Sequence, residues 1–130
     1  MTVKVSFNEE TSILAVEGRG QVLRREAGWA AERSSELIRT HPVGGVLVDC
    51  FAIQQQSSPA LSAEMISEFV AAIETGVPIA YVRSESWNAD YCERVVASLD
   101  SLPENARVFL QVDIAVDWLR AEVPAPAPVD

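Results

Sequence analysis

Apolar and polar residues alternate at the beginning of the chain. Apolar residues are separated by polar ones between Val3 and Phe7, and a second apolar stretch follows at residues 12–16. A period of two is typical of a strand that buries one face. Residues 1–17 are therefore predicted to form a hairpin of two antiparallel strands.

A spacing of three to four residues replaces this alternation in later segments. The clearest stripe runs from Leu61 to Ile73 and repeats every four residues, as one face of a helix does. Its start carries serine, which caps helices, and proline, which the first turn tolerates. Four helices are predicted: residues 23–40, from Ser57-Ser58-Pro59 to Gly76, from Asn88 as the cap to Pro103, and a short one capped by Asp113.

Three short runs between these helices are mostly apolar, as in strands that are covered on both faces. They are residues 46–48, with Asp49 at the carboxyl end, residues 78–82, with Arg83 just past the end, and residues 107–111. The order ββαβαβαβα predicts an α/β fold with a mixed sheet of about five strands, its N-terminal hairpin antiparallel and its later strands parallel, packed with about four helices.

The chain is predicted to form one domain over residues 1–122. Its 130 residues suit a single core, and 48% of them are hydrophobic. Residues 123–130 are rich in proline and alanine, so they are expected to form an extended tail.

Two segments carry a likeness to a known family. The segment Gly45-Val46-Leu47-Val48-Asp49, followed by Ser57-Ser58-Pro59-Ala60-Leu61, combines a buried strand, a loop and a serine-bearing helix start. Residues 106–119 combine a closing strand with a helix that carries Trp118 and Leu119. Together with the element order, these segments resemble the STAS-like domains of the SpoIIAA-like family, known from bacterial anti-sigma-factor antagonists. The resemblance implies a non-enzymatic regulatory or protein-interaction domain of bacterial origin.

The helix start departs from the antagonist pattern. In those STAS domains it reads Asp-Ser-Ser or Asp-Ser-Thr followed by Gly, and one hydroxyl accepts phosphate from a partner kinase. Here Ser57, Ser58, Pro59 and Ala60 stand on those four positions. The acid and the glycine are missing, and Pro59 removes one hydroxyl. The resemblance therefore leaves phosphorylation of Ser57 or Ser58 open.

Ligands of open α/β sheets gather beyond the carboxyl ends of the strands. Arg83 and the free N–H groups of the helix start could accept an anion or a carboxylate there. In the structural alternative, Asp49 pairs with Arg83, a serine is only a cap, and Trp87 folds over the next helix. The candidate ligand- or partner-binding residues are Asp49, Ser57, Ser58, Arg83 and Trp87, with Asp113 near the same edge.

The charge and composition of the chain argue against several classes of function. Nineteen acidic residues stand against ten basic ones, and the net charge of -9 disfavours nucleic acid and anionic membrane surfaces. Without a signal peptide or a long apolar run, a cytoplasmic protein without membrane insertion is expected. Cys50 and Cys92 have no metal or disulfide spacing and are predicted to be buried core residues. His41, the only histidine, has no nucleophile motif around it.

No enzymatic activity, metal or cofactor is therefore expected. The partner is predicted to be a protein or a small ligand. The alternative to a regulatory domain is a carrier of an anionic or lipid-like small molecule, which would use the strand-end site and the apolar helix faces beside it. A homodimer is possible, since an edge strand and apolar helix faces can pair.

Overall fold

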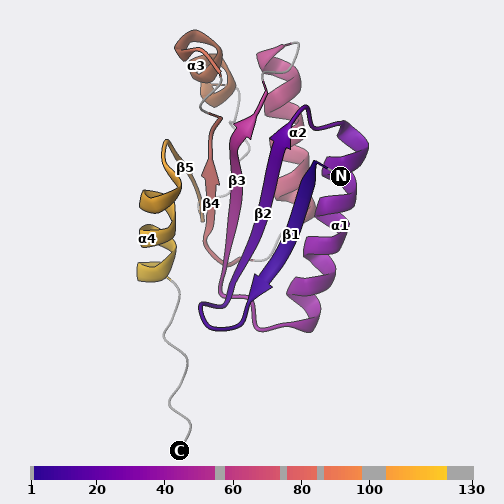
Figure 1. Ribbon diagram of the computed structural model, residues 1–130, viewed down its shortest axis with the longest axis vertical. Helices are drawn as coiled ribbons and strands as arrows, with labels where there is room; N and C mark the ends of the chain where they lie inside the picture. The colour runs from indigo at the N-terminus through magenta and orange to yellow at the C-terminus, as the bar shows by residue number, and fades with distance from the viewer. Residues whose placement is uncertain (1, 55–57, 74–75, 85–86, 98–104, 123–130) are drawn as a thin grey trace, which may run out of the picture.

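A computed structural model describes residues 2–54, 58–73, 76–84, 87–97 and 105–122. These residues form five strands and four helices that alternate as the sequence predicts (Figure 1). The strands are β1 (Val3–Asn8), β2 (Ile13–Gly20), β3 (Gly45–Ile53), β4 (Ile79–Val82) and β5 (Ala106–Phe109). The helices are α1 (Arg24–Thr40), α2 (Pro59–Ala72), α3 (Ala89–Ala97) and α4 (Val112–Glu122).

The strands form one mixed sheet in the order β1-β2-β3-β4-β5. β1 is antiparallel to β2, and the pairs from β2 to β5 are parallel. Figure 1 shows β2, β3 and β4 pointing up and β1 pointing down. The predicted fold class, an α/β fold with an antiparallel hairpin and later parallel strands, is confirmed.

The two faces of the sheet are covered unequally. Alternating side chains of one face, among them Val16, Val48 and Tyr81, enter a large core beneath α1, α2 and α3. On the other face, a smaller core joins Leu47 and neighbouring strand residues to Leu119 of α4. α4 contacts β3, β4 and β5, so it covers only one half of that face (Figure 1).

The central strand is longer than the sequence indicates. β3 continues past Asp49 to Ile53 because Arg19 and Gly20, at the end of β2, pair with Ala52 and Ile53. The prediction that Asp49 marks the carboxyl end of this strand is therefore wrong. The apolar run at residues 46–48 is only the part of the strand that β4 also flanks.

Two further boundaries differ at the end of the chain. β5 is Ala106–Phe109 rather than residues 107–111. α4 begins at Val112, so the predicted capping role of Asp113 is wrong, and this acid lies in the first turn instead. A carboxylate there is still favourable, because it faces the positive end of the helix dipole.

The other predicted helix starts are confirmed where they are described. Ser58 caps α2, with its Oγ accepting a hydrogen bond of 3.1 Å from the backbone N–H of Leu61 and Pro59 beginning the helix. Asn88 caps α3 through its Oδ1, which accepts from the N–H of Tyr91 at 2.8 Å. Ser57, the predicted end of the third helix at Pro103, and the predicted tail at 123–130 lie outside the described residues.

Candidate functional site

The strand-end residues share one level of the sheet. Asp49 pairs in register with Val82, the last residue of β4, and Arg83 follows directly. The backbone N–H of Arg83 donates to the carbonyl of Phe109 at the end of β5, over 3.0 Å. Among the described contacts, no ion pair joins Asp49 to Arg83. The pairing that the structural alternative predicted is therefore absent from them.

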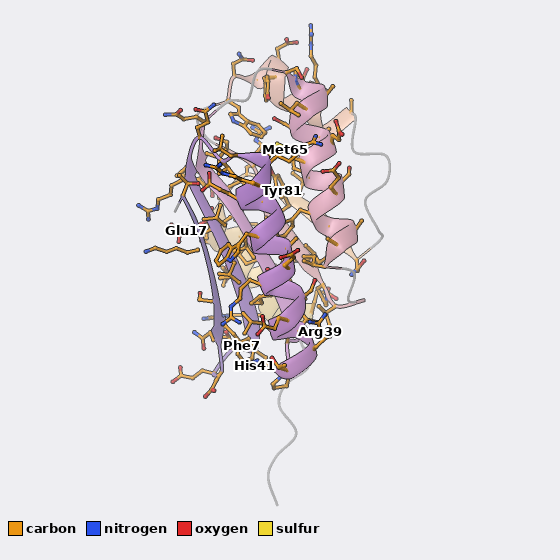
Figure 2. The ribbon with its side chains drawn as sticks, turned by 90° about the vertical axis from the view of Figure 1, so that its right-hand side faces the viewer. Phe7, Glu17, Arg39, His41, Met65 and Tyr81 are labelled. Atoms are coloured by element: carbon orange, nitrogen blue, oxygen red, sulfur yellow. The ribbon has the colours of Figure 1, made fainter. Side chains whose placement is uncertain are left out.

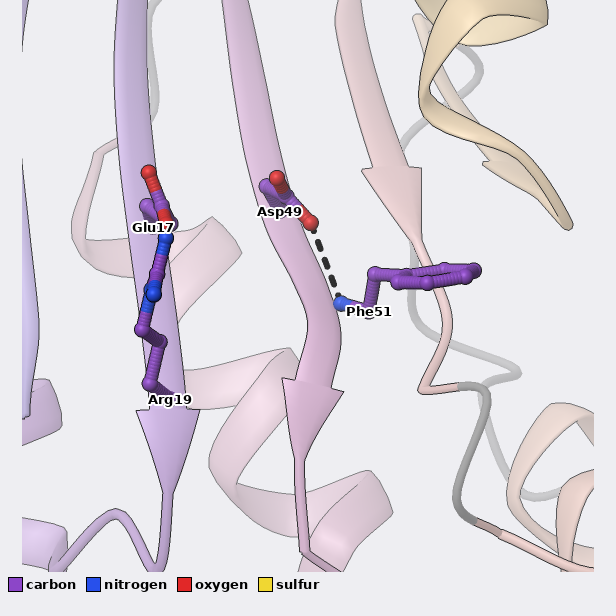
Figure 3. A network of polar contacts seen from close by, with 4 residues as sticks. All are labelled: Glu17, Arg19, Asp49 and Phe51. Atoms are coloured by element: carbon purple, nitrogen blue, oxygen red, sulfur yellow. Dashed lines mark hydrogen bonds and ion pairs between the residues drawn. The ribbon is translucent and has the colours of Figure 1, made fainter.

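Asp49 lies on the face of the sheet that carries α4, because Leu47 and Phe51, two residues to either side, pack in that core. Its Oδ1 accepts a hydrogen bond of 3.0 Å from the backbone N–H of Phe51 (Figure 3). In the neighbouring strand, Glu17 is the register partner of Asp49 and binds Arg19 at 2.8 Å. Each carboxylate thus has a local partner, and the two lie side by side on the half of the sheet beside α4.

The starts of α2 and α3 are joined by a buried polar contact. The Tyr91 hydroxyl donates to the carbonyl of Ser58 at 2.9 Å and lies 2.6 Å from the Ser62 Oγ. Trp87 stacks edge-on against Tyr91, with ring centroids 5.0 Å apart. Trp87 is 7% exposed, so it packs over the first turn of α3 as the structural alternative describes.

Ser84, which follows Arg83 directly, is a buried polar residue. It is 2% exposed, and its Oγ donates to the backbone carbonyls of Ile53 and Phe51. These hydrogen bonds hold the segment after β4 against the end of β3, which extends beyond the residues that pair with β4. A serine in a polar stretch gives no sign of burial, because exposed loops have the same composition.

An apolar cavity of about 90 Å³ lies behind Trp87, between the sheet and the first two helices. It is bordered by the carboxyl-end halves of β2 and β3, by the first turns of α1 and by α2. Figure 2 labels Met65 and Tyr81, which border it from α2 and from the sheet. Its lining residues are Val3, Val16, Gly18, Val22, Ala27, Ala30, Val48, Cys50, Ile53, Ser62, Met65, Ile66, Phe69, Val70, Tyr81 and Trp87.

Small side chains explain why this space is not filled. α1 presents Ala27 and Ala30 to it, and Ala30 is fully buried. Across from α1, β2 contributes Gly18, but the Ile53 side chain already fills that position, because a Cβ at Gly18 would lie 2.6 Å from the Cδ1 of Ile53. The unfilled space therefore lies beside the two alanines of α1, where close packing fails locally.

Cys50 borders the cavity and is half-buried against the large core, so it packs there but is less buried than predicted. Burial raises the pKa of its thiol to about 12, against a hydrogen bond with Tyr81 that lowers it. A thiol in this state is protonated at neutral pH and is a poor nucleophile. The side chain of Cys92 is not among those described.

His41 follows α1, where its backbone N–H donates to the carbonyl of Leu37 at 2.9 Å. Its ring lies 5.2 Å from that of Phe7, and its Nδ1 is 2.8 Å from the Thr40 hydroxyl (Figure 2). In the described part of the chain, no three His, Cys, Asp or Glu residues converge as a metal site would require.

Comparisons with known proteins add no assignment: no protein-family model matches the chain, and no curated protein does. The STAS-like resemblance therefore rests on the element order and the two segments that carry it, and it stays a prediction. Within the described residues, every helix is too short or too polar to cross a membrane.

Proposed function

We propose that this protein is a small, non-enzymatic binding domain whose cavity receives an apolar part of a small ligand. The cavity itself carries the proposal. Its walls are almost entirely hydrocarbon, and the Ser62 hydroxyl among them is engaged with Tyr91. Such apolar walls favour an apolar guest over water, because water would find too few hydrogen-bond partners there.

The position of the cavity agrees with the sequence-based expectation of a carrier. It borders the carboxyl-end halves of the central strands, and Trp87, a predicted binding residue, forms part of its wall. The high pKa of the Cys50 thiol supports binding rather than covalent chemistry at this place. The ligand of this proposal is the lipid-like one of the two carrier alternatives, since the cavity walls offer no charge to an anion.

The first experiment asks whether a ligand is retained. The protein purified from cells under native conditions is analysed by native mass spectrometry, and a bound small molecule with an apolar part is expected. The second locates the site: xenon, which enters dry cavities, is titrated while amide NMR signals are recorded. Shifts are expected at residues around the cavity, such as Cys50 and Tyr81.

A filling variant makes the test specific. Ala30→Leu adds three carbons to the cavity wall and should abolish the xenon response, whereas Ala71→Leu, the same change at an exposed position of α2, should leave it intact. Unchanged xenon binding by Ala30→Leu, or none by the unmodified protein, would refute the cavity as a binding site.

A cytoplasmic location is also proposed. The second proposal for the function is a regulatory or protein-interaction role, with a possible homodimer. This role is supported by the STAS-like element order and by the serine-capped start of α2. The measurement is the molar mass in solution by light scattering over a wide concentration range. A constant monomer mass would remove the homodimer from this proposal.

A further inference from the structure

A groove of about 650 Å³ runs along the outer surface between α1 and α2. Figure 2 views the molecule from this side, with the two helices next to each other and Arg39 at the lower end of α1. The α1 wall consists of positions three or four residues apart, from Arg24 to Arg39, and the α2 wall includes Met65, Glu68 and Phe69.

The groove and the cavity share part of their walls. Ala27, Met65 and Phe69 border both. Met65 is half-buried at this boundary. Methionine has an unbranched, flexible side chain that changes rotamer at little cost. A shift of Met65 would therefore join the groove to the cavity.

The cavity is too small to hold a complete ligand tightly. Its 90 Å³ equals the space of about three liquid waters, which leaves room for roughly four carbon atoms. Even at the best binding efficiency observed per ligand atom, four atoms give a Kd of about tens of micromolar at best. A ligand that binds more tightly must have further atoms outside the cavity, and the groove is the adjoining space.

Gly28 is unusual in the groove wall. It lies inside α1, where glycine destabilises a helix relative to alanine. A Cβ at Gly28 would meet no atom within 4 Å, so helix packing does not require the glycine. The missing side chain instead keeps the groove wide next to Ala27, where it meets the cavity.

The charged residues that line the groove next to its junction with the cavity are Arg24, one turn before Ala27, and Glu68, one turn after Met65. Arg24 binds Glu68 at 3.7 Å and Glu64 at 3.1 Å, so the charges at the junction are paired. Glu32, Glu36 and Arg39 line the groove farther along α1. A charged ligand group beside the cavity would have to compete with the pairs of Arg24. Neutral groups that hydrogen-bond would not.

We infer that the ligand is an amphiphile: a short alkyl segment enters the cavity past Met65, and an uncharged polar end, such as an amide or a hydroxyl, lies in the α1–α2 groove. This inference rests on the proposed function, because it assumes that the cavity is the apolar site. It adds the class of ligand and the place of its polar end.

The probes are hexanamide as the amphiphile, hexanoate and hexylamine as its charged counterparts, and xenon for the cavity alone. Each is titrated into the whole chain by amide NMR. Hexanamide is expected to shift signals both at the cavity, such as Cys50, and in the groove, such as Ser35. Both charged probes are expected to bind more weakly.

Gly28 supplies the variant and its control. Gly28→Leu fills the groove with a good helix-forming residue and should weaken hexanamide binding about tenfold. Xenon binding should stay unchanged, because Gly28 does not border the cavity. Gly28→Ala adds one carbon in open space and should change hexanamide binding much less.

Three results would count against these proposals in different ways. Hexanamide binding that is equal in Gly28→Leu and the unmodified protein, or shifts confined to the cavity, would overturn the groove assignment alone. Tighter binding of hexanoate or hexylamine would overturn the uncharged polar end. Absence of xenon binding in the unmodified protein would overturn the proposed function itself.

Discussion

Removing the Tyr91 hydroxyl tests the contact that holds α3 against α2 beside the cavity. Tyr91 is 4% exposed and Ser62 is 3% exposed, so water cannot replace the lost partner. Tyr91→Phe leaves the Ser62 Oγ without the partner that it has at 2.6 Å. The carbonyl of Ser58 keeps the N–H of Ser62 as a donor, at 3.2 Å. A single buried hydroxyl therefore loses its partner.

The loss of this one hydrogen-bond partner determines how much the free energy of unfolding is expected to fall. A buried polar group without a partner costs about 1–3 kcal/mol, and the phenyl ring itself is retained, so packing is preserved. Ser62→Ala should cost less, about 1 kcal/mol, because the Tyr91 hydroxyl keeps the Ser58 carbonyl as its acceptor. In Tyr91→Phe/Ser62→Ala no hydroxyl is stranded, so the double variant should be more stable than the sum of the single effects predicts, by about 0.5–3 kcal/mol.

Urea unfolding followed by circular dichroism measures these differences. With a slope of about 1–3 kcal/mol per molar urea, the midpoint of Tyr91→Phe should fall by on the order of 1 M. Ser6→Ala, on an exposed position of β1, serves as the control for removing a serine hydroxyl. The reasoning fails if Tyr91→Phe unfolds at the original midpoint, or if the two single effects simply add.

Three further outcomes are expected. Gly28→Ala should raise the free energy of unfolding by roughly 0.5–1 kcal/mol in thermal or urea unfolding, because the new Cβ meets nothing and helix propensity improves; a loss of stability would contradict this. Hydrogen bonds from Thr2 lower the pKa of Glu26 below 4.5, so its contribution to stability is complete above that pH and is lost as the pH falls through the lowered value. Glu26→Gln should flatten the acid side of the stability profile, and an unchanged profile would contradict the assignment. In a Cys92→Ser background, Cys50 should resist alkylation in the native protein and react rapidly in urea, because its pKa of about 12 leaves few thiolates.

The order of elements could be predicted because each has its own local signal. The stripe from Leu61 to Ile73 and the apolar run at residues 78–82 identify α2 and β4 without any knowledge of the rest of the chain. The caps at Ser58 and Asn88 are equally local, since a side-chain oxygen satisfies an N–H only three residues away. These are the parts of the prediction that the structure confirms.

The end of β3 could not be predicted, because it depends on a neighbour distant in sequence. Ala52 and Ile53 are strand residues since Arg19 and Gly20 of β2 extend far enough to pair with them. Their own sequence, followed by three glutamines, resembles the start of a polar loop. The sequence therefore predicts a strand end at Asp49, whereas this residue lies inside the strand and accepts a hydrogen bond from the backbone N–H of Phe51.

The cavity, like the end of β3, could not be predicted from the sequence, because it depends on how distant segments pack together. A missing volume has no residue of its own: it arises because Ala27 and Ala30 present only small side chains of α1 to the layer above β2 and β3. Each of these residues has an ordinary local explanation, since alanine favours helices. Their joint effect appears only once the rotation of α1 turns them toward the sheet. For a domain of this kind, the helical stripes locate the core, but the place where the core is incomplete, and hence where a ligand can enter, requires the folded structure.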